Sequence, residues 1–134
     1  MANKFILLPI ASLAFMIFLF GCGSKENPFT SPKPAETWNG TWVSSNDVSS
    51  GTMSMTITKS GTTYSGSLTM AGFPCFSTAT ITGWTVAGDT VTWSSPEIGN
   101  FTGTISGASI SGTYSVTSPG ACFGDTGVFS VTST

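Results

Sequence analysis

The sequence contains no histidine and no arginine, and its only basic side chains are four lysines among 134 residues. Without histidine there is no imidazole general base and no histidine metal ligand, and without arginine there is no bidentate clamp for phosphate or carboxylate groups. The net charge of -2 argues against nucleic acid as a partner, because phosphate backbones are bound through clustered basic side chains. We therefore expect a protein that is not an enzyme, needs no cofactor or metal, and binds no nucleic acid.

One long apolar run is present, from Phe5 to Phe20, after a short basic start that includes Lys4. The run is shorter than the roughly 20 residues of a membrane-spanning helix and fits the core of a secretion signal. An ordinary cleaved signal peptide and an uncleaved anchor helix are the two alternatives to the interpretation that follows.

Residues 19–22 read Leu-Phe-Gly-Cys, which resembles the lipobox of bacterial lipoproteins, although Phe20 is bulkier than the usual residue. The resemblance implies that residues 1–21 are removed as a lipoprotein signal peptide. It also implies that Cys22 receives a diacylglyceryl group and an N-acyl chain such as palmitate, so that the protein is anchored to the membrane by lipid. An aspartate directly after the lipidated cysteine would resemble a signal for retention in the inner membrane. Residue 23 is a glycine instead, which favours the outer membrane of the cell envelope.

Residues 22–37 contain Pro28, Pro32 and Pro34 and show no apolar periodicity. A Pro-rich segment of this length extends about 3 Å per residue and would span about 40 Å, so it predicts a tether between lipid and a domain over 38–134. Lipidation of Cys22 leaves Cys75 and Cys122 as a pair in an oxidising compartment. We predict a disulfide between them, and two reduced, buried thiols are the alternative.

From residue 38 onward, apolar residues alternate with Ser and Thr in short runs broken by turn residues, as they do around Met53, Met55 and Ile57. Such alternation predicts antiparallel strands with one solvent-exposed face. A glycine recurs on the apolar face, at Gly66 and Gly112 for example, which suits sharply coiled strands in a small barrel. The alternative explanation is that these glycines have no structural role and reflect sequence drift among Gly-rich repeats. The predicted strands cover 38–43, 52–59, 62–70, 76–86, 90–94, 100–106, 109–117 and 126–133.

Short and long connections alternate between these strands, which predicts an all-β, eight-stranded antiparallel up-and-down barrel with its long loops gathered at one end. We call this end the mouth. Gly40-Thr41-Trp42 on the first strand resembles the lipocalin and avidin-like, or calycin-type, barrels, although no arginine is available to pack on that tryptophan. Residues 38–134 also resemble small Gly/Thr-rich bacterial lipoproteins of unassigned function. A β-sandwich of the immunoglobulin type is the alternative fold.

Both Cys75 and Cys122 lie in mouth loops, so their disulfide would hold a lid over the opening. Phe73, Phe76 and Phe123 flank the cysteines and either pack under the lid or contact a ligand. We expect a non-enzymatic binding or structural module that meets an envelope partner through its mouth loops. One alternative is a carrier of a small apolar ligand, and another is a periplasmic protease inhibitor. The candidate ligand-binding residues are Met53, Met55, Trp93, Tyr114, Phe73 and Phe123.

The remaining chemical signals are weak. Asp125-Thr126-Gly127 matches the aspartic protease triplet, but only seven residues follow it, and turn formation explains it better. Asp47, Glu97 and Asp125 fall in predicted mouth loops without metal-ligand spacing, so solvated loop carboxylates are expected rather than a Ca²⁺ site.

Overall fold

The computed structural model describes residues 35–134. The predicted signal peptide, the lipidation of Cys22 and most of the predicted tether therefore lie outside the described residues. The first strand begins at Ala35, so the end of the segment predicted as tether belongs to the folded sheet.

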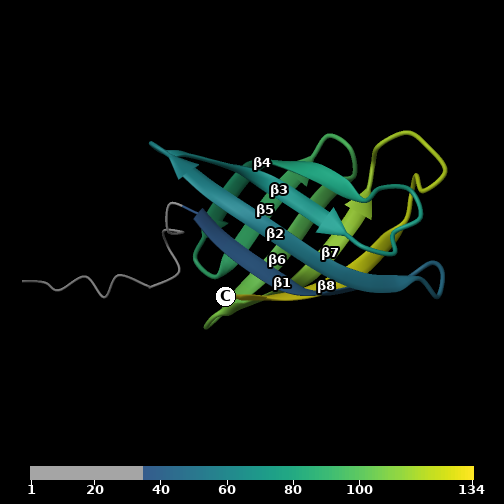
Figure 1. Cartoon of the computed structure of the whole chain (residues 1–134), viewed down its shortest axis with the longest axis horizontal. Helices are drawn as coiled ribbons and strands as arrows, with labels where there is room; N and C mark the ends of the chain where they lie inside the picture. The colour runs from purple at the N-terminus through teal and green to yellow at the C-terminus, as the bar shows by residue number, and fades with distance from the viewer. Residues whose placement is uncertain (1–34) are drawn as a thin grey trace, which may run out of the picture.

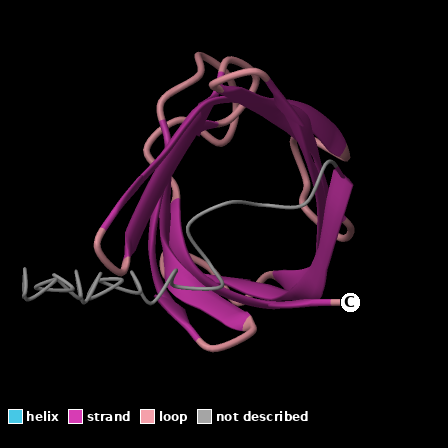
Figure 2. Cartoon of the chain, turned by 90° about the vertical axis from the view of Figure 1, so that its left-hand side faces the viewer, coloured by secondary structure: helices cyan, strands magenta, loops and turns pink. Residues whose placement is uncertain are grey.

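The described chain forms one closed barrel in which each strand pairs antiparallel with its neighbours in sequence and the last strand pairs with the first (Figures 1 and 2). The predicted up-and-down barrel is confirmed, and the alternative β-sandwich is wrong. The eight-stranded ring is consistent with the resemblance to calycin-type barrels. The strands are β1 (Ala35–Ser44), β2 (Ser50–Ser60), β3 (Thr63–Met70), β4 (Thr78–Ala87), β5 (Thr90–Ser95), β6 (Gly99–Ser106), β7 (Ser109–Val116) and β8 (Thr126–Ser133).

Alternation along the strands decides which side chains face inward. In β2, the side chains of Met53, Met55 and Ile57 are buried, while the residues between them are more exposed. Outside, hydroxyl groups pair across strands, as Ser111 does with Ser130 at 3.1 Å between the two Oγ atoms. The wall is therefore apolar within and hydroxyl-rich outside, as the sequence predicts. Among residues 35–134 there is no helix long and apolar enough to cross a membrane.

Strand β4 departs from simple alternation. Its pairing with β5 shifts register between Thr82 and Thr85, and Gly83 adopts a φ of 62°. A single extra residue in one strand moves every later side chain to the other face. Ala79 and Ile81 are buried before the shift, and Trp84 is buried after it. The bulge is thus the reason that Trp84 faces the interior.

Two kinds of close approach explain the inward glycines. A Cβ atom on Gly112 would overlap the backbone carbonyl of Thr102 on the neighbouring strand. At Gly103 a Cβ would instead lie 3.3 Å from the Phe129 ring and 2.8 Å from a methyl group of Ile110. The first glycine lets two strands approach closely, and the second leaves space for an aromatic ring.

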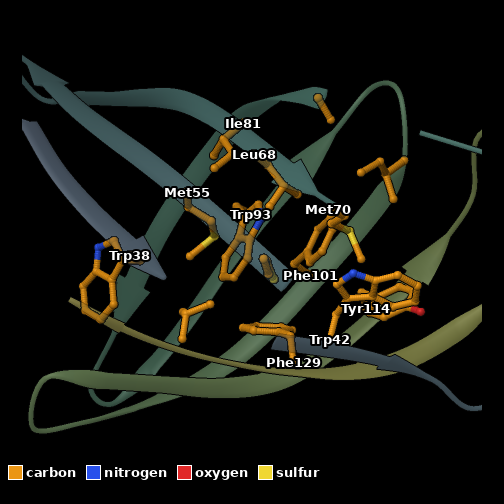
Figure 3. Packing of buried hydrophobic residues seen from close by; sticks show 14 of the residues in the cluster. Trp38, Trp42, Met55, Leu68, Met70, Ile81, Trp93, Phe101, Tyr114 and Phe129 are labelled. Atoms are coloured by element: carbon orange, nitrogen blue, oxygen red, sulfur yellow. The ribbon is translucent and has the colours of Figure 1, made fainter. Parts of the chain in front are cut away.

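The core fills the barrel with aromatic and methionine side chains (Figure 3). Trp93 stands at its centre: its ring stacks on Trp84 at 5.0 Å and on Phe101 at 5.1 Å between centroids, and it meets Phe129 edge to face at 5.3 Å. Such offset and edge-on arrangements match the preferred geometry of aromatic pairs.

Candidate functional site: the mouth of the barrel

Four long connections lie together at one end of the barrel, and the short turns lie at the other (Figure 1). The mouth loops cover 45–49, 71–77, 96–98 and 117–125. Cys75 and Cys122 form a disulfide with their Cα atoms 6.1 Å apart. The predicted bond is confirmed, and it joins the β3–β4 loop to the β7–β8 loop across the opening.

Phe73 and Phe123 have opposite environments at this end. The Phe73 side chain is buried, and its ring meets Trp42 edge to face at 4.9 Å and Tyr114 at 6.1 Å between centroids. Phe76 stacks on Phe73 at 6.0 Å. Phe123 is 68% exposed. Phe73 therefore packs under the lid and plugs the barrel, whereas Phe123 offers an aromatic surface to solvent.

A buried hydroxyl and a carboxylate hold two mouth loops together. The hydroxyl group of Ser44 donates to Oδ1 of Asp125 at 2.7 Å, and the hydroxyl of Tyr114 donates to Oδ2 at 3.0 Å. The backbone N–H of Asn46 donates to the Ser44 Oγ at 3.2 Å, and the Asn46 side-chain amide donates to the carbonyl of Gly124 at 3.1 Å. Both Asp125 oxygens thus serve as structural acceptors, which supports a turn-forming role for the Asp-Thr-Gly triplet.

Burial and hydrogen bonds at the mouth shift the pKa values of two ionisable groups. Burial raises the pKa of Tyr114, and the hydrogen bond to the Asp125 carboxylate raises it further. Hydrogen bonds from the side chain and the backbone of Ser49 hold the pKa of Asp47 below its usual value, and the backbone N–H lies 2.7 Å from Oδ1. At neutral pH the mouth therefore carries a neutral tyrosine and an ionised Asp47.

An open depression of about 460 Å³ lies between the loops beside the disulfide. The ionisable groups that line it are the carboxylates of Asp47 and Asp125, and its aromatic rings are Phe73 and Phe123. The lining residues are Asn46, Asp47, Ser49, Phe73, Pro74, Cys75, Ala121, Cys122, Phe123, Gly124 and Asp125. This surface can accept a cationic group next to an apolar one.

The other candidate ligand-binding residues lie inside the barrel. Met53, Met55, Trp93 and Tyr114 are all at least 98% buried in the core. Tyr114 is the member of this set that reaches the mouth, through its bond to Asp125. Met55 and Trp93 lie deeper in the barrel, and Figure 3 shows them to the left of Tyr114. The structure thus separates the predicted residues into a mouth group and an interior group.

Glu97, in the β5–β6 loop, belongs to a separate cluster. Its carboxylate accepts hydrogen bonds from the backbone N–H and the hydroxyl of Thr80, each at 3.0 Å, and from the hydroxyl of Ser95 at 2.9 Å. The backbone bond from Thr80 contributes most to lowering the pKa of Glu97 from 4.5 to about 2. Within the part of the chain that the structure describes, no three Cys, Asp or Glu side chains group as metal ligands.

Sequence reasoning missed three residues that shape these sites. Ser44 and Asn46 connect the mouth loops, and Trp84 joins the interior. The Ser-Ser-Asn-Asp stretch at 44–47 is a signal for turn capping, because these side chains bond nearby backbone groups. Thr82-Gly83 is the signal for the bulge, because a glycine that interrupts a strand often marks one.

The sequence matches no protein-family model, and a search of curated proteins finds no significant match.

Proposed function

We propose that this protein is a lipid-anchored, non-enzymatic binding protein of the bacterial cell envelope that holds a protein partner at the mouth of its barrel. The observation that carries the proposal is the depression of about 460 Å³, framed by loops that the Cys75–Cys122 disulfide and the Asp125 hydrogen bonds hold in place. A surface held in one conformation loses little entropy when it binds, which favours recognition.

Charge indicates the kind of partner. Residues 35–134 contain five carboxylate side chains and one lysine, Lys59. Lys59 lies opposite Tyr64 in the β2–β3 ladder, beside the turn that joins these strands at the end of the barrel opposite the mouth. The mouth depression contributes Asp47 and Asp125, with the exposed Phe123 ring at its edge. A partner segment that presents lysine or arginine beside an apolar side chain complements this surface in charge and in cation–π contact.

Attachment is tested first. Replacing Cys22 with serine should move the protein from the membrane fraction to the soluble fraction of the envelope, and it should abolish incorporation of a labelled fatty acid. If the Cys22→Ser protein stays in the membrane and keeps the label, the lipid anchor is wrong. A Cys75→Ser, Cys122→Ser double variant is the control, because it lacks the other two cysteines but keeps the candidate lipidation site.

Binding is tested with defined peptides on the Cys22→Ser protein. A peptide that alternates lysine and phenylalanine should bind and shift the NMR signals of the mouth loops, while its glutamate counterpart should not. Phe123→Ser and Asp47→Asn should each weaken the lysine peptide several-fold, and the effect of Asp47→Asn should shrink as salt increases. Asp89→Asn, in the β4–β5 turn at the opposite end, is the matched control. Equal binding of both peptides would contradict the proposed partner chemistry.

A further inference from the structure

A second depression lies on the outer wall of the barrel. It has a volume of about 300 Å³ and is formed by β6, β7 and β8 together with the residue that follows β1. It shares no lining residue with the mouth depression. Its volume is at the lower end of the range for small-ligand sites in proteins. Six of its lining residues carry a polar side chain that is exposed or half-buried: Ser45, Asn100, Thr102, Thr113, Ser115 and Thr126.

Strand register places four of these residues in a row across the wall. Asn100 on β6 lies opposite Ser115 on β7, and Ser115 lies opposite Thr126 on β8. The backbone N–H of Ser45 donates to the carbonyl of Thr126 at 2.7 Å, which extends the row to the end of β1. Neighbouring strands lie about 4.8 Å apart, so the row is a closely spaced line of hydroxyl and amide groups.

A second row, one step further from the mouth, ends in an apolar edge. Thr102 lies opposite Thr113, Thr113 lies opposite Val128, and Val128 lies opposite Val43. The side chains of Val128 and Val43 are 49% and 45% exposed. A ligand that covers this row therefore meets hydroxyl groups at one end and methyl groups at the other.

The polar side chains of the depression differ from those further along the same strands. Away from the mouth, Ser111 and Ser130 are opposed across β7 and β8, and their hydroxyl oxygens bond at 3.1 Å. A similar bond lies at the next exposed position. Ser115 and Thr126 are opposed on the same two strands, yet within residues 35–134 neither they nor the other four polar side chains of the depression form a side-chain hydrogen bond. Their donors and acceptors are thus available to a ligand.

The lining of this depression contains no carboxylate and no lysine. Lys59, the single lysine of residues 35–134, lies at the end of the barrel opposite the mouth, and Asp47 and Asp125 line the other depression. A charged ligand would therefore find no counter-charge here. A sugar hydroxyl donates one hydrogen bond and accepts others, as Ser and Thr hydroxyls do, and the amide of Asn100 can do both.

We propose that this depression binds a neutral glycan, whose hydroxyl groups bond to the two rows and whose ring C–H groups pack on Val128 and Val43. The depression is open to solvent, so each hydrogen bond to the glycan replaces bonds to water and contributes little. We expect a dissociation constant of about 1 mM for a short oligosaccharide. Because the two depressions share no residue, this proposal stands or fails independently of the proposed protein partner.

NMR titration of the Cys22→Ser protein tests the site with four neutral probes: maltotetraose, cellotetraose, laminaritetraose and the tetrasaccharide of N-acetylglucosamine. At least one should bind with a dissociation constant of about 1 mM and shift the amide signals of the two rows on β6, β7 and β8. Tetragalacturonic acid, which carries carboxylates, should bind several-fold more weakly. Added salt should leave the affinity for the neutral probe unchanged, in contrast to the lysine peptide at the mouth.

Thr102→Val and Thr113→Val should each weaken the bound probe about fivefold, because each removes a hydroxyl and keeps the shape of the side chain. Valine is well tolerated in strands, and two independent variants keep the test decisive if one does not fold. Thr69→Val is the matched control, since Thr69 is exposed on β3, at the opposite side of the ring from β7, and should change the affinity less than twofold.

A further variant separates this site from the mouth. Asp47→Asn should weaken the lysine peptide but leave glycan binding unchanged, and Thr113→Val should have the opposite effects. The glycan proposal is overturned if none of the four probes shifts the signals of the two rows, or if Thr102→Val and Thr113→Val leave the affinity unchanged. It is also overturned if the shifted signals belong to the mouth loops, or if the protein alone dimerises through this face.

Discussion

Removal of the disulfide tests how much the lid contributes to the fold. Cys75 and Cys122 are separated by 47 residues, and cross-linking a loop of this length lowers the entropy of the unfolded chain. The loop-entropy relation gives a stabilisation of about 4 kcal/mol at 25 °C for that separation. We expect Cys75→Ser with Cys122→Ser to lower the free energy of unfolding by an amount close to this value.

The barrel should nevertheless stay closed in the double variant, because the bond joins two loops and none of the eight strand pairings depends on it. Urea unfolding followed by tryptophan fluorescence measures the effect on three samples: the oxidised protein, the same protein reduced, and the double variant. The last two should unfold together at lower urea. A difference of less than about 1 kcal/mol from the oxidised protein would refute the loop-entropy argument, since the typical range begins at about 2 kcal/mol.

Other predictions concern close packing and pH. Gly112→Ala should lower the free energy of unfolding by about 3 kcal/mol, because its Cβ would overlap a carbonyl of the neighbouring strand. Gly61→Ala, in an open turn at a φ of 63°, should cost about 1 kcal/mol in the same urea titration, and equal costs would contradict this explanation. The raised pKa of Tyr114 means that the folded state holds this proton more tightly than the unfolded chain, so stability should fall as the pH rises above about 10. The urea concentration at the midpoint of unfolding, measured between pH 8 and 11, should decrease in the wild type and should decrease less in Tyr114→Phe. The lowered pKa of Glu97 gives a contribution that is present above pH 4.5 and lost as the pH falls towards 2. Glu97→Gln should therefore be less stable than the wild type at pH 6, this difference should shrink strongly by pH 2, and an undiminished difference at pH 2 would exclude this titration as the cause.

Strands and turns were predictable because their signals are local. Alternation over a few residues, as around Met53 and Met55, is enough to mark a strand with one apolar face. Turn residues such as Gly61 and Gly107 mark where the chain reverses, and both have positive φ angles in the structure. The predicted strand ends differ from the observed ones by at most three residues, and the largest difference is the start of β1 at Ala35.

The candidate site was only partly predictable. Counting was enough to predict the disulfide, because lipidation of Cys22 would leave Cys75 and Cys122 as a pair, but the three phenylalanines near them looked alike in the sequence. Whether such a ring is buried depends on what the other loops place above it. Phe73 falls between Trp42 and Tyr114, which come from strands far apart in the sequence, while nothing comparable covers Phe123.

The sequence by itself determined the positions of the strands along the chain, the alternation of wall faces, the lengths of the connections and the pair of cysteines, because each follows from short-range patterns or from counting. The tertiary structure decided between the predicted barrel and the alternative β-sandwich, because β8 pairs with β1 although the two strands lie at opposite ends of the described chain. It also decided the inward turn of Trp84 at the bulge and the bonding of Ser44 to Asp125 across 81 residues. These features depend on the spatial register between distant strands, and that register is fixed only when the ring closes and the core packs.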